Sequence, residues 1–253
     1  MKISVITICR NSQATIGYTI ESFLRQRHPN KELVVVDGLS TDDTLKIIDS
    51  FSSDAISVVS EADAGIYDAM NKGLRRYSGE AVGFLHSDDT FHDETSLETI
   101  AEALGKADIV FGDLEMVRDH VSKDIVRVWR PGDFTRLGFH LGWIPPHPTL
   151  YTRRKVFDAV GEFDTKYAIA ADYDFMLRAL MKHRFSSMYA RTTLVDFQVG
   201  GTSTKGLSSF ITGNLECLDS RRRHFGRFPI DLALFGRPIR RLYQVSLWSK
   251  ASR

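Results

Sequence analysis

Short apolar runs alternate with helical patterns along the first half of the chain. Runs rich in β-branched residues predict buried parallel strands at 3–8, 32–38, 56–59 and 82–85. Between them, apolar residues at helical spacing predict helices at 14–27, 45–51 and 66–77. Strands and helices in this order predict a mostly parallel, doubly wound α/β sheet.

The second half of the chain has a less regular pattern. We expect a helix at 93–104, strands at 108–113 and 126–129, a helix or structured loop at 133–142, and a short helix at 156–160. A longer helix opens near Ala170, with Asp172 and Asp174 in its first turn, and strand-like pieces follow at 185–197. We find no internal repeat and no low-complexity linker.

Acidic residues follow three of the predicted parallel strands. Asp37 ends the second strand, Glu61 follows the third, and Ser87-Asp88-Asp89 follows the fourth. Because the carboxyl ends of parallel strands meet along one edge, these acids should line one crevice, the usual ligand position in open α/β sheets. Hard oxygen ligands suit Mg²⁺ or Mn²⁺. The alternative is that Ser87-Asp88-Asp89 caps a helix and forms its first turn.

Composition adds limits on the class of protein. The 253 residues are 43% hydrophobic and 26% charged, which is ordinary for a soluble globular protein, and the net charge of +1 argues against a protein dominated by nucleic-acid binding. Cys9 and Cys217 are the only cysteines, so a reducing compartment is the default. The first residues are strand-like rather than a signal peptide, and no apolar stretch reaches membrane-spanning length. We therefore expect a cytoplasmic protein.

Familiar catalytic motifs of several enzyme classes are absent from the sequence. It has no Walker A loop and no G-x-G-x-x-G, which argues against a P-loop NTPase and a dinucleotide dehydrogenase. It also lacks a recognisable Ser/His/Asp or Cys/His nucleophile pattern, which is consistent with a mechanism that needs no covalent intermediate.

Six short motifs occur in the order found in one enzyme family. They are 4–7 (SVIT), 35–44 (VVDGLSTDDT), 60–73 (SEADAGIYDAMNKG), 84–89 (FLHSDD), 171–174 (ADYD) and 199–203 (VGGTS). On these motifs the chain resembles the family 2 glycosyltransferases of the GT-A fold, especially bacterial members that build exopolysaccharides and other surface glycans of the colanic-acid type. The resemblance extends from residue 1 to about residue 203.

The resemblance implies roles for particular residues. Asp37 would hold the nucleobase, and Glu61, Asp68 and Asn71 would line the nucleoside and sugar. Asp89 would bind the metal, with Asp88 near the ribose or the metal, and Asp172 would be the catalytic base. The chain departs from the family's common pattern at two positions: His86 replaces an Asp or Asn, and Ala171 replaces the acid that usually precedes the base.

Each of these residues also has an ordinary structural interpretation. Asp37 could simply end a strand, Glu61 could be a solvated loop acid, and Asp68 and Asn71 share a helix face with Lys72 or Arg75. Asp172 could be a first-turn helix acid. His147, between two prolines, could contact the acceptor or the diphosphate or could pack in a loop. Gly201 and Ser203 could contact phosphate or form a plain turn.

The segment 221–253 differs in character from the preceding chain. It carries nine Lys and Arg residues against one acid, Asp231, interleaved with large apolar residues. This composition fits an interfacial helix on an anionic membrane, beside a lipid-linked acceptor. It equally fits a helix packed on the domain or across a dimer. We therefore predict a GT-A domain at 1–220 and a basic, amphipathic C-terminal extension at 221–253.

These observations favour one function over its rivals. The predicted protein is an inverting, metal-dependent glycosyltransferase that takes a sugar from a nucleotide donor, with UDP favoured, and adds it to a growing or lipid-linked surface polysaccharide. The cofactor would be Mn²⁺ or Mg²⁺, and the enzyme could sit at the inner face of the plasma membrane. The rivals are a catalytically silent nucleotide- or glycan-binding module, a sugar-phosphate nucleotidyltransferase, and a nucleic-acid-binding protein acting through the basic segment.

Overall fold

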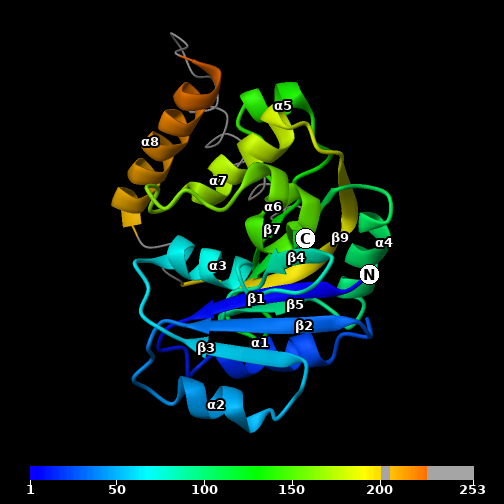
Figure 1. Ribbon diagram of the computed structural model, residues 1–253, viewed down its shortest axis with the longest axis vertical. Coiled ribbons are helices and arrows are strands. Elements are labelled where there is room, and N and C mark those ends of the chain that lie inside the picture. The colour runs from blue at the N-terminus through cyan, green and yellow to red at the C-terminus, as the bar shows by residue number, and fades with distance from the viewer. Residues whose placement is uncertain (201–205, 227–253) are drawn as a thin grey trace.

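A computed structural model describes residues 1–200 and 206–226 of the chain (Figure 1). The elements of the first half are β1 (Ile3–Cys9), α1 (Ile16–Leu24), β2 (Lys31–Asp37), α2 (Thr44–Ser50), β3 (Ile56–Ser60), α3 (Ile66–Leu74), β4 (Ala81–Phe84), β5 (Asp89–Phe91) and α4 (Ser96–Leu104). Those of the second half are β6 (Ile109–Val117), β7 (Ile125–Trp129), α5 (Arg136–His140), the 3₁₀ turn η1 (His147–Thr149), β8 (Tyr151–Arg153), α6 (Arg154–Val160), α7 (Ala171–Met176), the π-helical turn η2 (Leu177–Lys182), β9 (Ser187–Gln198) and α8 (Gly206–Phe225).

The strands of the described residues form one nine-stranded sheet. Its order is β3-β2-β1-β4-β8-β6-β9-β5, and β7 pairs with β6 outside this path. The four strands β3, β2, β1 and β4 are parallel to one another, as the first half of the sequence predicts. The second half extends this sheet with antiparallel pairs, among them β4 with β8 and β5 with β9. The predicted α/β class is confirmed, and its doubly wound part is the first half.

Hydrophobic side chains form a separate core on each face of the sheet. Ile3 and Val5 of β1 pack with α1, α2 and α4, whereas Ile6 of the same strand packs with α3, α6 and α7. This division follows from the strand geometry, since successive side chains point to opposite faces. Figure 1 shows α1 and α2 on one side of the parallel strands and α3 on the other. Fully burying one such side chain contributes roughly 1.5–3 kcal/mol, so the two cores fix the ends of the parallel strands firmly.

Two short strands differ from the expectations. Asp89 opens β5, and the next helix begins only at Ser96, so the alternative that Ser87-Asp88-Asp89 caps a helix is wrong. The second is β8, which brings Tyr151 across Gly83 of β4; a Cβ at Gly83 would lie 2.4 Å from the Tyr151 ring. Strands of three residues are too short to produce an alternating pattern, and therefore the sequence did not reveal them.

The last described helix crosses the predicted domain boundary. Helix α8 continues past residue 220 to Phe225, and Arg221 is buried with 4% of its surface exposed. Arg221 donates to the Tyr173 hydroxyl over 3.2 Å, which ties α8 to α7. Residues 227–253, most of the predicted extension, lie outside the described residues. Over the part of the chain that the structure covers, no helix combines the length and hydropathy that crossing a bilayer requires.

Candidate active site

Four of the predicted site acids lie at one edge of the sheet, where the parallel strands end. Cys9 pairs with Asp37 between β1 and β2, and Asp37 pairs with Ser60 between β2 and β3. The next residue, Glu61, donates its backbone N–H to the Asp37 carbonyl over 2.9 Å. Strand β4 ends beside β1 at the same edge and leads into Asp88 and Asp89. The parallel register thus gathers these residues as the sequence predicts.

The Asp37 carboxylate is buried and held by hydroxyl groups. Its oxygens accept the Ser40 backbone N–H at 3.0 Å, the Ser60 hydroxyl at 2.6 Å and the Ser40 hydroxyl. Burial acts to raise its pKa, but the hydrogen bonds from Ser40 and Ser60 outweigh that effect and hold the pKa of Asp37 below its ordinary value. The side chain is therefore ionised and fixes the loop after β2.

Glu61 and Asp68 form a small ion-pair network with basic residues of α3 and its C-terminal end. Lys72 Nζ lies 3.8 Å from Glu61 and 3.4 Å from Asp68, and Arg76 lies 3.4 Å from Glu61. Asp68 also accepts the Ala64 backbone N–H at 3.0 Å, near the start of α3. The network brings two of the predicted sugar-lining acids together beside two cations.

Asn71 is buried and binds the backbone of a distant residue. Its amide nitrogen donates to the Phe163 carbonyl over 2.9 Å, and its amide oxygen accepts the Phe163 N–H over 3.0 Å. This pair of bonds fastens α3 to the loop that precedes α7. The structure thus gives Asn71 a structural task, and its contact with a sugar donor stays a prediction.

Asp88 and Asp89 follow a tight turn, and their burial differs. The Asp89 N–H donates to the His86 carbonyl over 3.0 Å. Asp88 is half-buried, whereas Asp89 is fully buried, and neither Asp89 carboxylate oxygen has a hydrogen-bond partner among the described residues. Burial, and then the charge of Asp88, raise the pKa of Asp89 well above its ordinary value. A buried carboxylate without a donor is costly unless a proton or a cation neutralises it, so these residues fit a hard divalent cation.

His86 and His147 stack beside this turn. Their ring centroids are 6.1 Å apart, and the His147 ring also stacks on Phe84 at 5.5 Å. The pKa of each histidine is lowered to about 4, by burial for His147 and by burial together with the charge of His147 for His86. Both rings are therefore neutral at pH 7. The structure brings His147, a predicted acceptor or phosphate contact, to the end of β4.

Asp172 lies in the first turn of α7. Its Oδ1 accepts the Tyr67 hydroxyl at 3.3 Å and the Tyr173 N–H at 2.7 Å. Asp88 and Asp172 both raise the pKa of His86, so both carboxylates lie near that ring. The candidate metal pair and the candidate base are thus neighbours in space although 84 residues separate Asp88 and Asp172 in the sequence. Gly201 and Ser203 lie outside the described residues.

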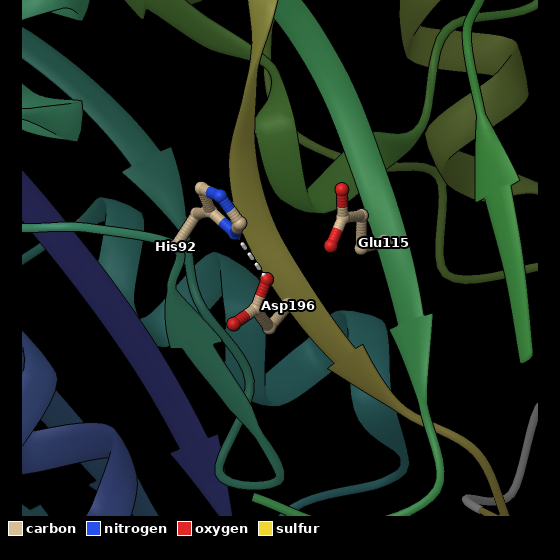
Figure 2. A group of neighbouring side chains, drawn as sticks. All are labelled: His92, Glu115 and Asp196. Atoms are coloured by element: carbon tan, nitrogen blue, oxygen red, sulfur yellow. Dashed lines mark hydrogen bonds and ion pairs between the residues drawn. The ribbon is translucent and has the colours of Figure 1, made fainter. Parts of the chain in front are cut away.

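A second cluster of candidate metal ligands lies on the other face of the sheet. His92, Glu115 and Asp196 bring one ligand atom each within 4.8 Å of one another (Figure 2). Thr90, not Asp89, pairs with Asp196, so the Asp89 and Asp196 side chains point to opposite faces. Asp196 already pairs with His92 at 2.6 Å and with Lys123 at 3.3 Å. A cation here would displace the Lys123 ammonium, which makes Asp89 the better candidate ligand.

Two residues of this site, Tyr67 and His86, are not among the predicted site residues. Tyr67 joins α3 to Asp172 through its hydroxyl, and His86 connects the Asp88 turn to His147. From the sequence, Tyr67 was one residue of the 60–73 motif, and His86 was a departure from the family pattern. Both roles depend on contacts with residues more than 60 positions away, which local spacing does not reveal.

Comparisons with known proteins give a consistent result. The family model described as "Glycosyl transferase family 2" matches residues 4–165. A relative from Mycobacterium bovis, a "PGL/p-HBAD biosynthesis glycosyltransferase", is 30% identical over 207 residues, which are 79% of this chain and 78% of that protein.

Two solved structures share the fold at low sequence identity. Staphylococcus aureus TarS 1-349 in complex with UDP-GlcNAc has a TM-score of 0.70 and 20% identity, with 96% of this chain and 73% of TarS covered. The mannosyltransferase PcManGT from Pyrobaculum calidifontis, in complex with GDP-Man and Mn²⁺, has a TM-score of 0.64 and 19% identity, with 96% and 69% covered. These likenesses confirm the expected GT-A-like α/β fold.

Proposed function

The chain belongs to glycosyl transferase family 2, and from this premise we propose that it is an inverting, metal-dependent glycosyltransferase. The proposed donor is a nucleotide sugar, because the UDP-GlcNAc complex of TarS and the GDP-Man complex of PcManGT share its fold. We favour UDP over GDP because the TarS complex has the higher TM-score, 0.70 against 0.64. The proposed acceptor is a growing or lipid-linked surface polysaccharide. The name of the mycobacterial relative, which refers to PGL/p-HBAD biosynthesis, supports an acceptor of the glycolipid class.

One observation carries this proposal. Asp88 and Asp172 both act electrostatically on the His86 ring at the end of the parallel strands, and the next residue after Asp88 is the buried Asp89, whose carboxylate has no hydrogen-bond partner among the described residues. A metal-binding pair and a general base are the two groups that direct transfer from a sugar diphosphate requires. Their proximity supports a reaction centre rather than two unrelated acidic clusters.

In the proposed reaction, Asp172 accepts the proton of the acceptor hydroxyl. The acceptor oxygen then forms a bond to the anomeric carbon as the bond from that carbon to the diphosphate oxygen breaks, with inversion at the carbon. The nucleoside diphosphate leaves with the bonding pair. The Tyr67 hydroxyl and the Tyr173 N–H both donate to Asp172 Oδ1 and so fix the orientation of the carboxylate. Holding the base in one orientation contributes to the rate by positioning it.

Asp89, with Asp88 beside it, would hold Mn²⁺ or Mg²⁺. When bound, the cation supplies a Lewis acid that stabilises the charge developing on the departing diphosphate. Neutral His86 and His147 add no positive charge to this position at pH 7, because burial lowers the pKa of each to about 4. Charge neutralisation at the diphosphate would therefore fall to the cation.

The remaining predicted contacts belong to the donor and the acceptor. We propose that Asp37 positions the nucleobase, that Glu61 and Asp68 face the nucleoside and sugar, and that His147 contacts the acceptor or diphosphate. Gly201 and Ser203 are proposed phosphate contacts. The ordered Asp37 loop supports the first role, since a carboxylate fixed by Ser40 and Ser60 costs no reorganisation when a base binds.

We also propose peripheral attachment at the inner face of the plasma membrane through the basic segment 221–253. The exposed side chains of Arg222 and Arg223 near the end of α8 support this, whereas Arg221 is buried against α7. Basic residues near an anionic surface contribute about 1 kcal/mol each.

A donor panel tests the proposed function. The purified protein is incubated with Mn²⁺, lipid-linked glycan acceptors and either UDP- or GDP-sugars, and products are identified by mass spectrometry. The anomeric configuration of the product is then read by NMR. Transfer from one donor with inversion supports the proposal. A folded protein that binds donors but transfers none would instead be a nucleotide-binding module.

A further inference from the structure

Helix α8 contributes one side chain directly to the loop that precedes the candidate base. Glu216 accepts three consecutive backbone N–H groups, from Ala168 to Oε1 at 2.9 Å and from Ile169 and Ala170 to Oε2 at 2.9 and 2.8 Å. Ala170 is the residue before α7, and it has no side chain able to cap the helix. A carboxylate from another helix therefore accepts the three consecutive amides that lead into α7, and one of these amides belongs to the N-cap residue.

The same loop makes two further contacts, one with α3 and one with α8. The Tyr67 hydroxyl donates to the Ile169 carbonyl over 2.6 Å and also to Asp172. On α8, one turn before Glu216, a Cβ at Gly213 would lie 3.1 Å from Ile169 Cγ2, so glycine permits the helix to approach the loop this closely. The backbone two to four residues before Asp172 is thus held by α8, and the base itself by α3.

We propose that Glu216 is a positioning residue for the catalytic base. By holding the 168–170 backbone it sets the direction of the first turn of α7, and with it the place of the Asp172 carboxylate relative to the acceptor hydroxyl. This inference rests on the proposed function, because it assigns Asp172 the role of base. Glu216 itself touches neither donor nor acceptor in this account.

Two substitutions and a matched control test the proposal. E216A removes all three acceptor contacts, whereas E216Q keeps the shape but replaces one acceptor oxygen with an NH₂ group. D219A removes a carboxylate from the same helix, one that contacts the side chains of Tyr167 at 2.8 Å and Lys166 at 3.0 Å rather than this backbone. Thermal unfolding of each variant establishes the folded fraction, and E216Q carries the test if E216A does not fold.

The first measurement is hydrogen exchange of peptides covering 164–176. We expect amides 168–170 to exchange roughly 10-fold faster or more in E216A than in the wild type and D219A, because local opening becomes easier. The second is turnover at saturating donor. We expect kcat to fall roughly 10- to 100-fold, since a misplacement near 1 Å can cost about 10²-fold, with the donor KM within about two-fold because donor contacts are intact.

The outcomes separate this inference from the proposed function. Wild-type kcat in a folded E216A protein, an equal loss in D219A, or a change confined to donor KM would each overturn the positioning role. If amides 168–170 exchange as slowly in folded E216A as in the wild type, the positioning role of Glu216 is wrong, whatever activity the wild-type protein has. A wild-type protein that transfers no sugar would instead overturn the proposed function.

Discussion

At the scale of single residues, the most informative feature is a buried carboxylate without a donor. Asp89 is fully buried, and neither carboxylate oxygen has a hydrogen-bond partner within 3.5 Å among the described residues. Burial and the charge of Asp88 raise its pKa and outweigh the His86 and Gln198 backbone groups, which lower it. Structural acids elsewhere in the chain are satisfied: Asp37 has Ser40 and Ser60, and Asp174 has Ser220 and Arg178 at 2.7 Å each. Asp37 and Asp174 thus have partners within the protein, whereas the Asp89 carboxylate is suited to bind a cation.

Loss of the Asp89 charge should remove metal-dependent donor binding. We expect D89N to weaken Mn²⁺-dependent UDP binding by at least the roughly 10–100-fold that loss of an outer-shell partner costs, as measured by calorimetry. E115Q, in the cluster of Figure 2, is the control and should bind like the wild type. If D88N loses the metal effect while D89N retains it, Asp88 is the ligand; if only E115Q loses it, the metal lies on the other face.

Removing the proposed base should affect turnover without affecting donor binding. We expect D172N to reduce kcat roughly 10²- to 10⁴-fold, the usual contribution of a positioned general base. The donor affinity measured by calorimetry should stay close to that of the wild type. A D172N protein with normal transfer rates would show that another group accepts the proton.

The two stacked histidines predict how stability depends on pH. Their folded pKa of about 4 lies below the unfolded value near 6.5, so their contribution is present above pH 6.5 and is lost as pH falls toward 4. Urea unfolding should therefore show lower stability at pH 5 than at pH 7, by up to about 2 kcal/mol per histidine. The double variant H86N/H147N should show a smaller decrease over this interval. An equal decrease in both proteins would contradict the assignment.

Residue types at strand ends could be predicted, but their partners could not. The apolar runs placed Asp37, Glu61 and Asp88-Asp89 correctly at one edge, because hydrophobic pattern and strand direction are local properties. The partner of Asn71 is the backbone of Phe163, 92 residues away, and the partners of Glu216 are 46 to 48 residues away. Such contacts follow from tertiary packing, and no spacing rule signals them.

At the scale of elements, the α7 segment is held by α3, which precedes it in the sequence, and by α8, which follows it. Asn71 and Tyr67 of α3 bind Phe163, Ile169 and Asp172, and Glu216 of α8 binds the amides before α7. The candidate base therefore depends on three elements that are distant in sequence. This arrangement explains why α8 continues through the predicted boundary at 220: its inner face is part of the packed domain.

Cutting the α3 connection should destabilise the fold measurably. N71A leaves the Phe163 N–H and carbonyl without their partner in a buried position, which costs about 1–3 kcal/mol per unsatisfied group. We expect the unfolding midpoint to fall by roughly 2–4 °C per kcal/mol for a chain of this size. The exposed N30A variant is the matched control and should unfold like the wild type. Equal midpoints for N71A and the wild type would contradict the structural role of Asn71.

The elements that sequence analysis missed share a physical cause. Strands β5 and β8 have three residues each and owe their conformation to pairing with β9 and β4. The long parallel strands carry their own signal, because both faces are covered and the apolar runs are continuous. The sequence pattern thus predicted the long parallel strands, whereas β5 and β8 form only through strand pairing in the folded protein.

At the scale of the whole molecule, the fold is a two-faced sheet whose parallel edge presents acids to the proposed nucleotide-sugar site. The match over residues 4–165 and the mycobacterial relative show the family, and the two solved structures share the fold. The net charge of the chain is near neutral because the acids, including those at the strand edge, are balanced by basic residues, many of them after residue 220. Donor, acceptor and membrane would then meet different parts of one domain.

The most direct test of the central claim is calorimetric titration of the wild-type protein with UDP, GDP and their sugar conjugates, first with Mn²⁺ and then with EDTA. The account predicts that UDP or a UDP-sugar binds with Mn²⁺ and that EDTA abolishes or strongly weakens this binding. GDP should bind more weakly under both conditions. If the folded protein binds none of these nucleotides, or binds them equally well with EDTA, the proposal of a metal-dependent nucleotide-sugar site at the Asp88–Asp89 pair is wrong.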